Sequence, residues 1–463
     1  MATIQDALHA CPKPRFMLVS DLDHTMVQNE DLTHEKLQLF NRLWSINFSG
    51  DSLLVFSTGR SPNLFCQLWD EAPLLTPNVL ICSVGSEIFY RTPDGSLLPD
   101  KAWEAYLDQG WDRAAVQALA AKYPQLAPQV ASEQRRHKLS FHLQRSTAEA
   151  DEAVLQGLRE ALAAAGLAAK VIYSGGVDVD VLAQGAGKGK ALEFILKELQ
   201  EAGAYPPDGV QVNGDSGNDI ELFQVPGVRG CVVSNAHPEL RNWATAALDP
   251  SKGGSATPAT LHIAQQPCAG GIVEALLLFG SVQNPPQPQS LLRGFVTELG
   301  LLQSNALAGN LALLAEPGAT WVTPAGRVLQ VVQCMGEPAD AAAAGLTWVD
   351  RICVRPLVQS KGGQTSIHQQ GGAAAADAPA GTVNNSSLTS SISEGELLVV
   401  TYQLWSFKGQ SRDSSRVRQC SVVVRASQPG AADGFKLLHL HEGVMAADVT
   451  ATAAFAALAA TST

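Results

Sequence analysis

The sequence predicts an α/β protein with a parallel sheet at its core, an inserted α+β module and a separate β-rich region after it. Short apolar segments alternate with helix-like segments up to about residue 280, as in a parallel sheet covered by helices. Residues 91–182 differ, because their strands alternate apolar and polar residues as in a half-buried sheet. At 463 residues the chain is too long for a single hydrophobic core, so several domains are expected.

The core is expected to consist of residues 1–90 and 183–280, on either side of the inserted module. Short apolar segments in both parts are typical of buried strands, and longer segments with helical periodicity lie between them. Core strands are expected within 15–20, 52–60, 78–90, 209–219 and 230–236, with helices near 35–46 and 192–203. Module strands are expected at 137–144, 169–174 and 177–183, with a helix at 151–167.

A linker rich in Pro and Gln at 281–290 separates a third region, 291–445, from the core. Strand signals recur along this region, so we expect a separate β-rich domain. A stretch rich in Ala, Gly and Ser at 369–396 and the Ala-rich tail at 446–463 offer little apolar surface to bury, which predicts a mobile loop and tail. The expected strands lie within 319–333, 346–358, 396–407 and 417–427.

The composition excludes several classes of protein. Hydrophobic residues make up 46% of the chain, and no apolar run approaches the about 20 residues that a membrane span requires. A net charge of -12 argues against a nucleic-acid surface, which depends on clustered Lys and Arg. The eight cysteines are scattered without a C-x-x-C pair, so buried reduced thiols are expected rather than disulfides or zinc ligands. No targeting pattern is evident near Met1, and the expected compartment is the cytoplasm.

Two carboxylates, Asp21 and Asp23, directly follow the strand predicted at 15–20. A D-x-D pattern alone is a weak signal, because about one is expected by chance in a chain of this size. The sequence contains a second D-x-D pattern, Asp178 and Asp180, which lies inside a predicted strand and is consistent with a chance match. Position distinguishes the first pair, since ligands collect at the carboxyl ends of the strands in open α/β sheets.

Three further polar clusters follow in the order expected for strand ends and helix starts of one sheet. The Gly-rich stretch before the second of them lacks the G-x-x-x-x-G-K-[ST] spacing of a nucleotide-binding P-loop, so that alternative is set aside. We therefore predict an active site along one edge of the sheet. The members of the three clusters are Thr58 and Gly59, then Lys188, then Asp215, Asn218 and Asp219.

The carboxylates match the chemistry of phosphate monoester hydrolysis, which needs acceleration by up to about 10²¹-fold. Asp21 can attack phosphorus and form an aspartyl-phosphate. Because an anion then approaches an anion, a cation is required, and Asp21 with Asp215 offers the hard oxygen ligands of Mg²⁺. Asp23 is placed to protonate the leaving oxygen and later to activate water.

The remaining polar residues supply charge and hydrogen bonds. The Thr58 hydroxyl and the Gly59 amide can hold phosphoryl oxygens, and Lys188 adds a fixed positive charge. Asp219 is expected to orient Lys188 or a metal-bound water. Asn218 is expected to bind the substrate.

The four motifs also resemble a known family. They read DLDHT, STGR, GAGKGKAL and GDSGNDIELF, and they resemble motifs one to four of the haloacid dehalogenase phosphatases. From about residue 15 to 280 the chain resembles, more specifically, the sucrose-phosphate phosphatases of plants and algae. The resemblance implies a Rossmann-like core with an inserted α+β cap and Mg²⁺-dependent hydrolysis of sucrose 6-phosphate. It also implies that Asp21, the Asp23 carbonyl and Asp215 bind the metal.

The same resemblance extends past the linker. Segments that read GATWVTPAGRV, TWVDRICVRPL and YQLWSFKGQ resemble the C-terminal α+β domain of that family, which is similar to nuclear transport factors. Candidate assemblies are a homodimer through this domain and a complex with sucrose-phosphate synthase, without nucleic acid or membrane. One alternative is another phosphatase, acting on trehalose or mannosylglycerate phosphate. The other is a mainly complex-forming protein in which catalysis is secondary.

Sugar selectivity is expected to come from the cap, because the motif residues contact only phosphate and metal, which every phosphomonoester offers. A site that pairs with the hydroxyls of a disaccharide rejects analogues that lack them. The residues that the resemblance places near the sugar are Glu87, His137, Lys138 and Asp178.

Overall fold

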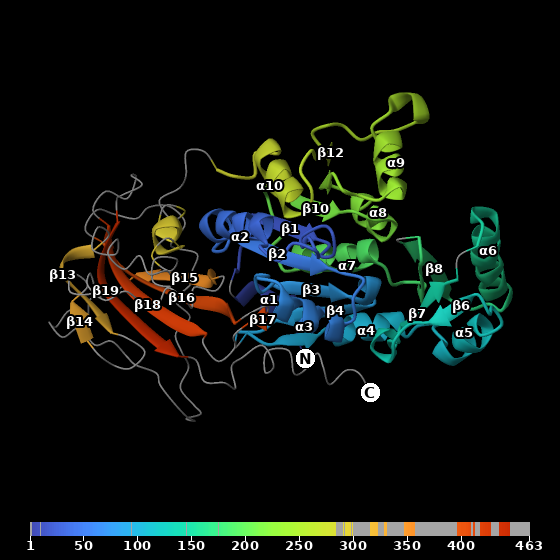
Figure 1. Ribbon diagram of the computed structural model, residues 1–463, viewed down its shortest axis with the longest axis horizontal. Coiled ribbons are helices and arrows are strands. Elements are labelled where there is room, and N and C mark those ends of the chain that lie inside the picture. Colours follow the sequence, from blue (N-terminus) through green and yellow to red (C-terminus); the bar gives the residue numbers. More distant parts are fainter. Residues whose placement is uncertain are drawn as a thin grey trace.

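The computed structural model describes most of the first 283 residues and the strands of the third region (Figure 1). The tail predicted at 446–463 and all but the last residue of the loop predicted at 369–396 lie outside the described residues. Among the residues that are described, no helix is long and apolar enough to cross a membrane. The described ranges are 2–9, 11–93, 95–144, 146–174, 176–283, 290, 292–297, 299, 315–322, 328–330, 347–356, 396–408, 411–412, 417–426 and 435–444.

An eight-stranded sheet forms the core, in the order β12-β11-β10-β1-β2-β3-β4-β5. The strands from β12 to β3 are parallel, which confirms the predicted α/β class. The last two pairs, β3 with β4 and β4 with β5, are antiparallel, because only the short η1 turn Ser83–Gly85 joins β3 to β4 and a parallel crossover needs a longer connection. The strands are β1 Phe16–Ser20, β2 Ser52–Ser57, β3 Val79–Cys82, β4 Glu87–Arg91, β5 Leu97–Pro99, β10 Val210–Gly214, β11 Val228–Val232 and β12 Leu261–Ile263.

Helices cover both faces of this sheet, so its central strands are apolar on both sides (Figure 1). Phe16 and Leu18 of β1 face a cluster that includes residues of α2 and α3, whereas Met17 and Val19 face a cluster that includes residues of α1 and α7. The helices are α1 Ile4–His9, α2 Glu35–Asn47, α3 Pro62–Glu71, α4 Lys101–Leu107, α7 Lys188–Glu201, α8 Ile220–Phe223, α9 Pro238–Ala247 and α10 Ala269–Leu278.

The inserted module is a four-stranded antiparallel sheet in the order β6-β7-β9-β8, and it lies beside the carboxyl end of the core (Figure 1). Leu139 and Phe141 of β7 pack against the helices α5 and α6, so the alternate residues Lys138 and Ser140 lie on the opposite, polar face. The elements are α5 Arg113–Ala120, β6 Leu126–Pro128, η2 Ala131–Glu133, β7 Lys138–Leu143, α6 Ala148–Ala164, β8 Ala169–Ser174 and β9 Asp178–Ala183.

The start of the module differs from the predicted boundary at residue 91. Strand β5 pairs with β4 at the edge of the core sheet, and Trp103 and Leu107 of α4 pack into a core cluster. The alternating pattern of this segment did not reveal that difference, because an antiparallel edge strand of the core has the same pattern as a strand of the module.

The third region contains a sheet in the order β14-β13-β19-β18-β16-β15, with β17 paired to β16. This confirms the predicted β-rich region, and the likeness to nuclear transport factors stays a prediction. Trp348 and Trp405 are buried, and they join the cluster that includes residues of α2 and α3. The strands are β13 Ala315–Val322, β14 Val328–Gln330, β15 Thr347–Pro356, β16 Leu397–Lys408, β17 Ser411–Arg412, β18 Arg418–Ala426 and β19 Phe435–Val444.

The six cysteines whose side chains the structure describes are free thiols, as the sequence predicted. Five of them are buried, and Cys66 is partly exposed. Burial raises the pKa of Cys268 to about 11, which keeps that thiol protonated at neutral pH.

Candidate active site

The predicted motif residues converge at the carboxyl ends of neighbouring strands. Asp21 follows β1, Thr58 follows β2 and Asp215 follows β10, and these three strands are adjacent in the sheet. The Asp21 amide donates to the Asn213 carbonyl at 3.1 Å, which continues the pairing of β1 with β10 to the site. Lys188 is the first residue of α7 and reaches the same place.

Three buried carboxylates surround one buried ammonium group. Asp21, Asp215 and Asp219 each offer an oxygen within 4.8 Å of the others. The Lys188 ammonium donates to Asp21 Oδ1 and to Asp219 Oδ1, each at 2.7 Å. The second Asp219 oxygen accepts from the amides of Asp215 and Ser216 at 3.0 and 3.1 Å. Asp219 thus fixes both Lys188 and the turn that carries Asp215.

Two glycines allow this close arrangement. A side chain at Gly214 would meet the Asp219 carboxyl group at 2.6 Å, so only glycine lets the strand end approach that side chain. Gly187 precedes Lys188 with φ at 133°, a conformation that favours glycine. Both residues belong to the motifs read from the sequence.

The carboxylates carry more negative charge than Lys188 neutralises. Burial, followed by the charges of Asp21 and Asp219, raises the pKa of Asp215 to about 9. Burial also raises the pKa of Asp21 to about 7, against the opposing effect of Lys188. An excess of buried carboxylate is costly unless a cation pairs with it.

The arrangement therefore fits a hard divalent cation. The Asp219 oxygens already accept from Lys188 and from two amides, which leaves Asp21 and Asp215 as the residues to hold it. The Thr25 hydroxyl donates to Asp215 Oδ1 at 3.2 Å and orients that carboxylate.

The stability of the metal-free protein should fall as the pH rises from about 4 to 9. A carboxyl group with a raised folded pKa stays protonated in the fold while the unfolded chain already ionises above about pH 4, so stability declines from there until the pH reaches about 7 for Asp21 and 9 for Asp215. Thermal melts in EDTA and in Mg²⁺ across this range test the expectation. Mg²⁺ should flatten the decline, and parallel curves in the two conditions would contradict it.

Asp23 forms a two-point ion pair with Arg60. The Arg60 Nε and Nη2 atoms donate to the two Asp23 oxygens, each at 2.7 Å, and Asn29 adds a third hydrogen bond at 2.9 Å. Burial acts to raise the pKa of Asp23, but Arg60 outweighs it and lowers that pKa. Asp23 is therefore held ionised in this structure, in the form that can accept a proton from water.

Thr58 and Gly59 form a short loop between β2 and α3, and Asn218 lies close to it. The Thr58 side chain is buried, and its hydroxyl accepts from the Arg60 amide at 3.1 Å. A methyl group built on Gly59 would lie 3.9 Å from Asn218 Nδ2. The structure thus brings together three of the residues that the sequence assigned to substrate binding.

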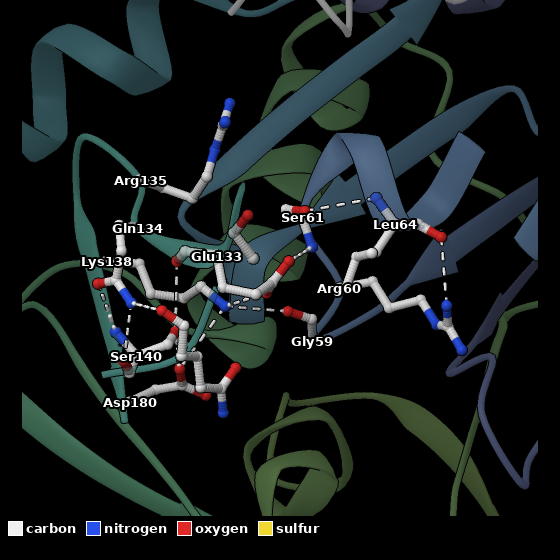
Figure 2. A network of polar contacts seen from close by, with 12 residues as sticks. Gly59, Arg60, Ser61, Leu64, Glu133, Gln134, Arg135, Lys138, Ser140 and Asp180 are labelled. Carbon is white, nitrogen blue, oxygen red and sulfur yellow. Dashed lines mark hydrogen bonds and ion pairs between the residues drawn. The ribbon is translucent and has the colours of Figure 1, made fainter. Parts of the chain in front are cut away.

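The polar face of the inserted sheet contacts this loop directly, as Figure 2 shows. The Lys138 ammonium donates to the Gly59 carbonyl at 3.2 Å and to Glu133 Oε2 at 2.9 Å. The other Glu133 oxygen accepts from the Ser61 amide at 3.1 Å. Asp180, on the neighbouring strand, lies 3.6 Å from the Lys138 ammonium. Glu133 and Lys138 therefore join the module to the loop that carries Thr58.

Two further ion pairs join the module to the core. Arg135 donates to both oxygens of Glu87, at 2.8 and 3.0 Å. Lys170 of β8 donates to Glu221 of α8 at 2.6 Å. These pairs flank the Lys138 contact and hold the polar face of the module toward the carboxylates.

Two of the predicted sugar-binding residues lie away from the Lys138 contact. The His137 ring is buried against Asp108, with Nε2 at 2.8 Å from Oδ1. Asp178 is partly exposed and contacts Gln129 at 2.9 Å and His142 at 3.0 Å. The contacts of His137 and Asp178 with a sugar stay predictions.

Sequence patterns alone did not indicate roles for Glu133, Arg135 and Arg60. Arg60 is the last residue of the STGR motif, so its position in the sequence could have indicated a role in the site. Glu133 and Arg135 belong to a charged run without periodicity, and a solvated surface loop has the same composition. Only the fold shows that this run reaches the core.

Comparison with known proteins gives a family for the first three fifths of the chain. The family model described as Sucrose-6F-phosphate phosphohydrolase matches residues 14–280. Sucrose-phosphatase 2 of Nicotiana tabacum is 45% identical over 262 residues, which is 57% of this chain and 58% of that protein. Mannosylfructose-phosphate phosphatase of Agrobacterium fabrum is 31% identical over 229 residues, which is 49% of this chain and 86% of that protein.

A solved structure covers the same part of the chain. The sucrose-phosphatase of a Synechocystis species, in complex with sucrose and phosphate, is 34% identical with a TM-score of 0.49 and covers 58% of this chain and 98% of that chain. The chain thus matches just under three fifths of the length of the plant relatives, 58% for the tobacco protein.

Proposed function

Because the chain belongs to the Sucrose-6F-phosphate phosphohydrolase family, we propose that it is a Mg²⁺-dependent phosphatase that hydrolyses sucrose 6-phosphate to sucrose and phosphate. The observation that carries the proposal is the buried group of Asp21, Asp215 and Asp219 around Lys188. The contact of Lys138 with the Gly59 carbonyl supports a sugar site beside it. This reaction would complete the synthesis of sucrose.

In the proposed mechanism, Asp21 attacks phosphorus and the bond from phosphorus to the sugar oxygen breaks. Asp23, carrying the proton that it took from water in the preceding turnover, gives it to that oxygen and then takes a proton from the water that releases phosphate. Thr58, Gly59 and Lys188 hold the phosphoryl oxygens, together with Asn218. Mg²⁺, held by Asp21, Asp215 and the Asp23 carbonyl, would neutralise the charge between nucleophile and phosphate.

Asp23→Asn should slow sugar phosphates more than phosphates with a good leaving group. The substitution keeps the backbone carbonyl proposed as a metal ligand but removes the proton donor, which an activated ester does not need. The measurement is kcat/KM for sucrose 6-phosphate and for 4-nitrophenyl phosphate. A loss of about 10²-fold or more on the sugar substrate and a smaller loss on the ester are expected. Equal losses of kcat/KM on the two substrates would contradict the acid/base role of Asp23.

We propose that the polar face of the module recognises the sugar, with Lys138 and Asp178 as its residues, His137 at its margin and Glu87 of the core strand β4 beside it. Lys138 is held by Glu133 and Asp180 at the point where this face meets the phosphate loop. Pairing of this face with sucrose hydroxyls would leave buried polar groups unpaired when a smaller substrate binds.

Lys138→Ala should therefore lower kcat/KM for sucrose 6-phosphate far more than for 4-nitrophenyl phosphate. Lys170→Ala is the matched control, because it removes the other lysine that joins the module to the core without changing the contact at Gly59. The control should affect both substrates alike. If Lys138→Ala also lowers kcat/KM for both substrates alike, Lys138 positions the cap, and the proposal that it contacts the sugar is wrong.

A phosphate-release panel tests the substrate. The purified protein is supplied with sucrose 6-phosphate, trehalose 6-phosphate, mannosylfructose phosphate, mannosylglycerate phosphate and 4-nitrophenyl phosphate, each with Mg²⁺ and with EDTA. The relative named for mannosylfructose phosphate is the reason to include that substrate. The highest kcat/KM is expected for sucrose 6-phosphate in Mg²⁺. Preference for another sugar phosphate would replace sucrose 6-phosphate as the proposed substrate. Turnover in EDTA would contradict the proposed requirement for Mg²⁺.

We further propose a cytoplasmic protein divided into a core that includes β5 and α4, a cap inserted after α4 and ending at residue 182, and an accessory domain at 291–445. A homodimer and a complex with sucrose-phosphate synthase are the assemblies proposed for the accessory domain. The alternative in which complex formation is the main role predicts negligible turnover by the purified protein alone. Rapid turnover without a partner would exclude it.

A further inference from the structure

The accessory sheet contacts the core at the end of α3 opposite the active site. Helix α3 begins next to the phosphate loop, with Ser61 as its N-cap residue, and ends at Glu71. Beyond that end lies Arg412 of β17, a short strand paired with β16. Arg412 is 7% exposed, so its guanidinium group is buried between the two domains.

Arg412 binds the carbonyl groups at the end of α3. Its Nε atom donates to the Trp69 carbonyl at 2.8 Å, and Nη2 donates to the carbonyls of Ala72 and Leu74 at 3.0 and 2.9 Å. Carbonyls in the last turn of a helix lack partners within the helix, and they carry its negative dipole end. A guanidinium group supplies several donors and a positive charge at once.

Three tryptophans enclose the same guanidinium group. Its central carbon lies 3.2 Å from the ring centre of Trp69, 4.7 Å from that of Trp348 and 5.0 Å from that of Trp405. Trp69 belongs to α3, whereas the other two belong to the accessory sheet. Stacking on aromatic faces strengthens with desolvation, so Arg412 is held rigidly against α3.

The opposite end of α3 is bonded to the active-site loop. Arg60 Nη1 donates to the Leu64 carbonyl at 3.2 Å, and the Leu64 amide donates to the Ser61 hydroxyl at 3.4 Å. Arg60 also binds Asp23, and the Ser61 amide binds Glu133 of the cap. A shift of α3 along its axis would therefore move the loop, the Asp23 carboxylate and the cap contact together.

We propose that Arg412 is a positioning residue for the phosphatase reaction, which acts through α3 on the phosphate loop at residues 58–61. The inference rests on the proposed function for its reaction but not on the identity of the sugar. It gives the accessory domain a role in turnover, in addition to its role in assembly.

Arg293 provides a matched control. It is a second buried arginine from beyond the linker, and its Nε atom donates to the Ile46 carbonyl near the end of α2 at 2.9 Å. Helix α2 begins at Glu35 and does not adjoin the phosphate loop. Loss of Arg293 should therefore loosen the domain contact without moving residues 58–61.

The experiment compares the full-length protein with Arg412→Met, Arg412→Lys and Arg293→Met. The readouts are melting temperature, kcat for 4-nitrophenyl phosphate and for sucrose 6-phosphate, and inhibition by inorganic phosphate. Arg412→Met should lower kcat on both substrates and weaken phosphate inhibition by about tenfold, because a displacement of the order of 1 Å in an active site has effects of this size or more. Arg412→Lys should recover part of the loss. Arg293→Met should lower the melting temperature with kcat within about twofold of the wild type.

Unchanged kcat and phosphate inhibition in Arg412→Met would overturn the inference, as would equal losses in Arg293→Met. If Arg412→Met does not fold, Arg412→Lys decides, since wild-type values in that variant also overturn it. If sucrose 6-phosphate is not a substrate, 4-nitrophenyl phosphate still reports on the loop, so the failure of the sugar assignment is seen separately. If neither ester is hydrolysed, calorimetric binding of inorganic phosphate gives the same comparison.

Discussion

Asp21→Asn should lower kcat by about 10⁴-fold or more on every phosphomonoester, because it removes the attacking oxygen and a proposed metal ligand together. The fold should persist. Asp21 is one of three buried carboxylates around Lys188, so the neutral amide relieves the repulsion that, after burial, contributes most to raising the pKa of Asp215 to about 9. The melting temperature in EDTA should therefore stay equal to that of the wild type or rise.

The stabilisation by Mg²⁺ should be reduced in the same variant. Thermal melts with and without Mg²⁺ measure it independently of turnover. Asp112→Asn is the control, because it makes the same chemical change at the exposed N-cap of α5, where Asn also serves as a cap. Robust turnover by Asp21→Asn, with the control unchanged, would contradict the assignment of the nucleophile.

Lys188→Met should have the second largest effect, on stability as well as on rate. Lys188 is fully buried and donates to Asp21 and Asp219, so its loss leaves uncompensated carboxylates. Breaking a buried ion pair on one side costs about 3–5 kcal/mol, and the loss of one donor to the phosphoryl group lowers kcat by about 10²–10³-fold. The deficit in stability should shrink as the pH falls toward 4, because protonated carboxyl groups no longer repel one another.

Urea unfolding at several pH values measures that deficit, and initial rates measure the loss of kcat. Lys190→Met is the matched control, since Lys190 lies two residues further along the same helix, is exposed to solvent and pairs with Glu193 at 2.8 Å. It should leave stability and kcat nearly unchanged. A deficit in Lys188→Met that grows at low pH would show that Lys188 does not compensate these carboxylates.

The core strands were predictable because local signals and the fold agree there. Segments such as β1 and β2 are apolar on both faces, which is the pattern of buried parallel strands, and the polar residues after them mark the strand ends. Asp21, Thr58, Lys188 and Asp215 could therefore be assigned to one site before their distances were known.

Contacts between distant segments could not be predicted in the same way. Glu133 and Arg412 lie in segments whose composition also suits a solvated surface, and nothing local indicates that each binds one end of α3. The edge strand β5 was assigned to the cap for a related reason, because its pattern does not identify the sheet to which it belongs. These features depend on how the domains pack.

Trapping of the phosphoenzyme tests the central claim, which is that Asp21 is the nucleophile. The wild-type protein is mixed with sucrose 6-phosphate in Mg²⁺, quenched in acid within one turnover and treated with borohydride, which reduces an acyl phosphate to an alcohol. Peptide mapping by mass spectrometry then locates the modified residue. The expected product is homoserine at position 21, absent when EDTA replaces Mg²⁺. Modification at another carboxylate would contradict the assignment, as would turnover without any trapped intermediate.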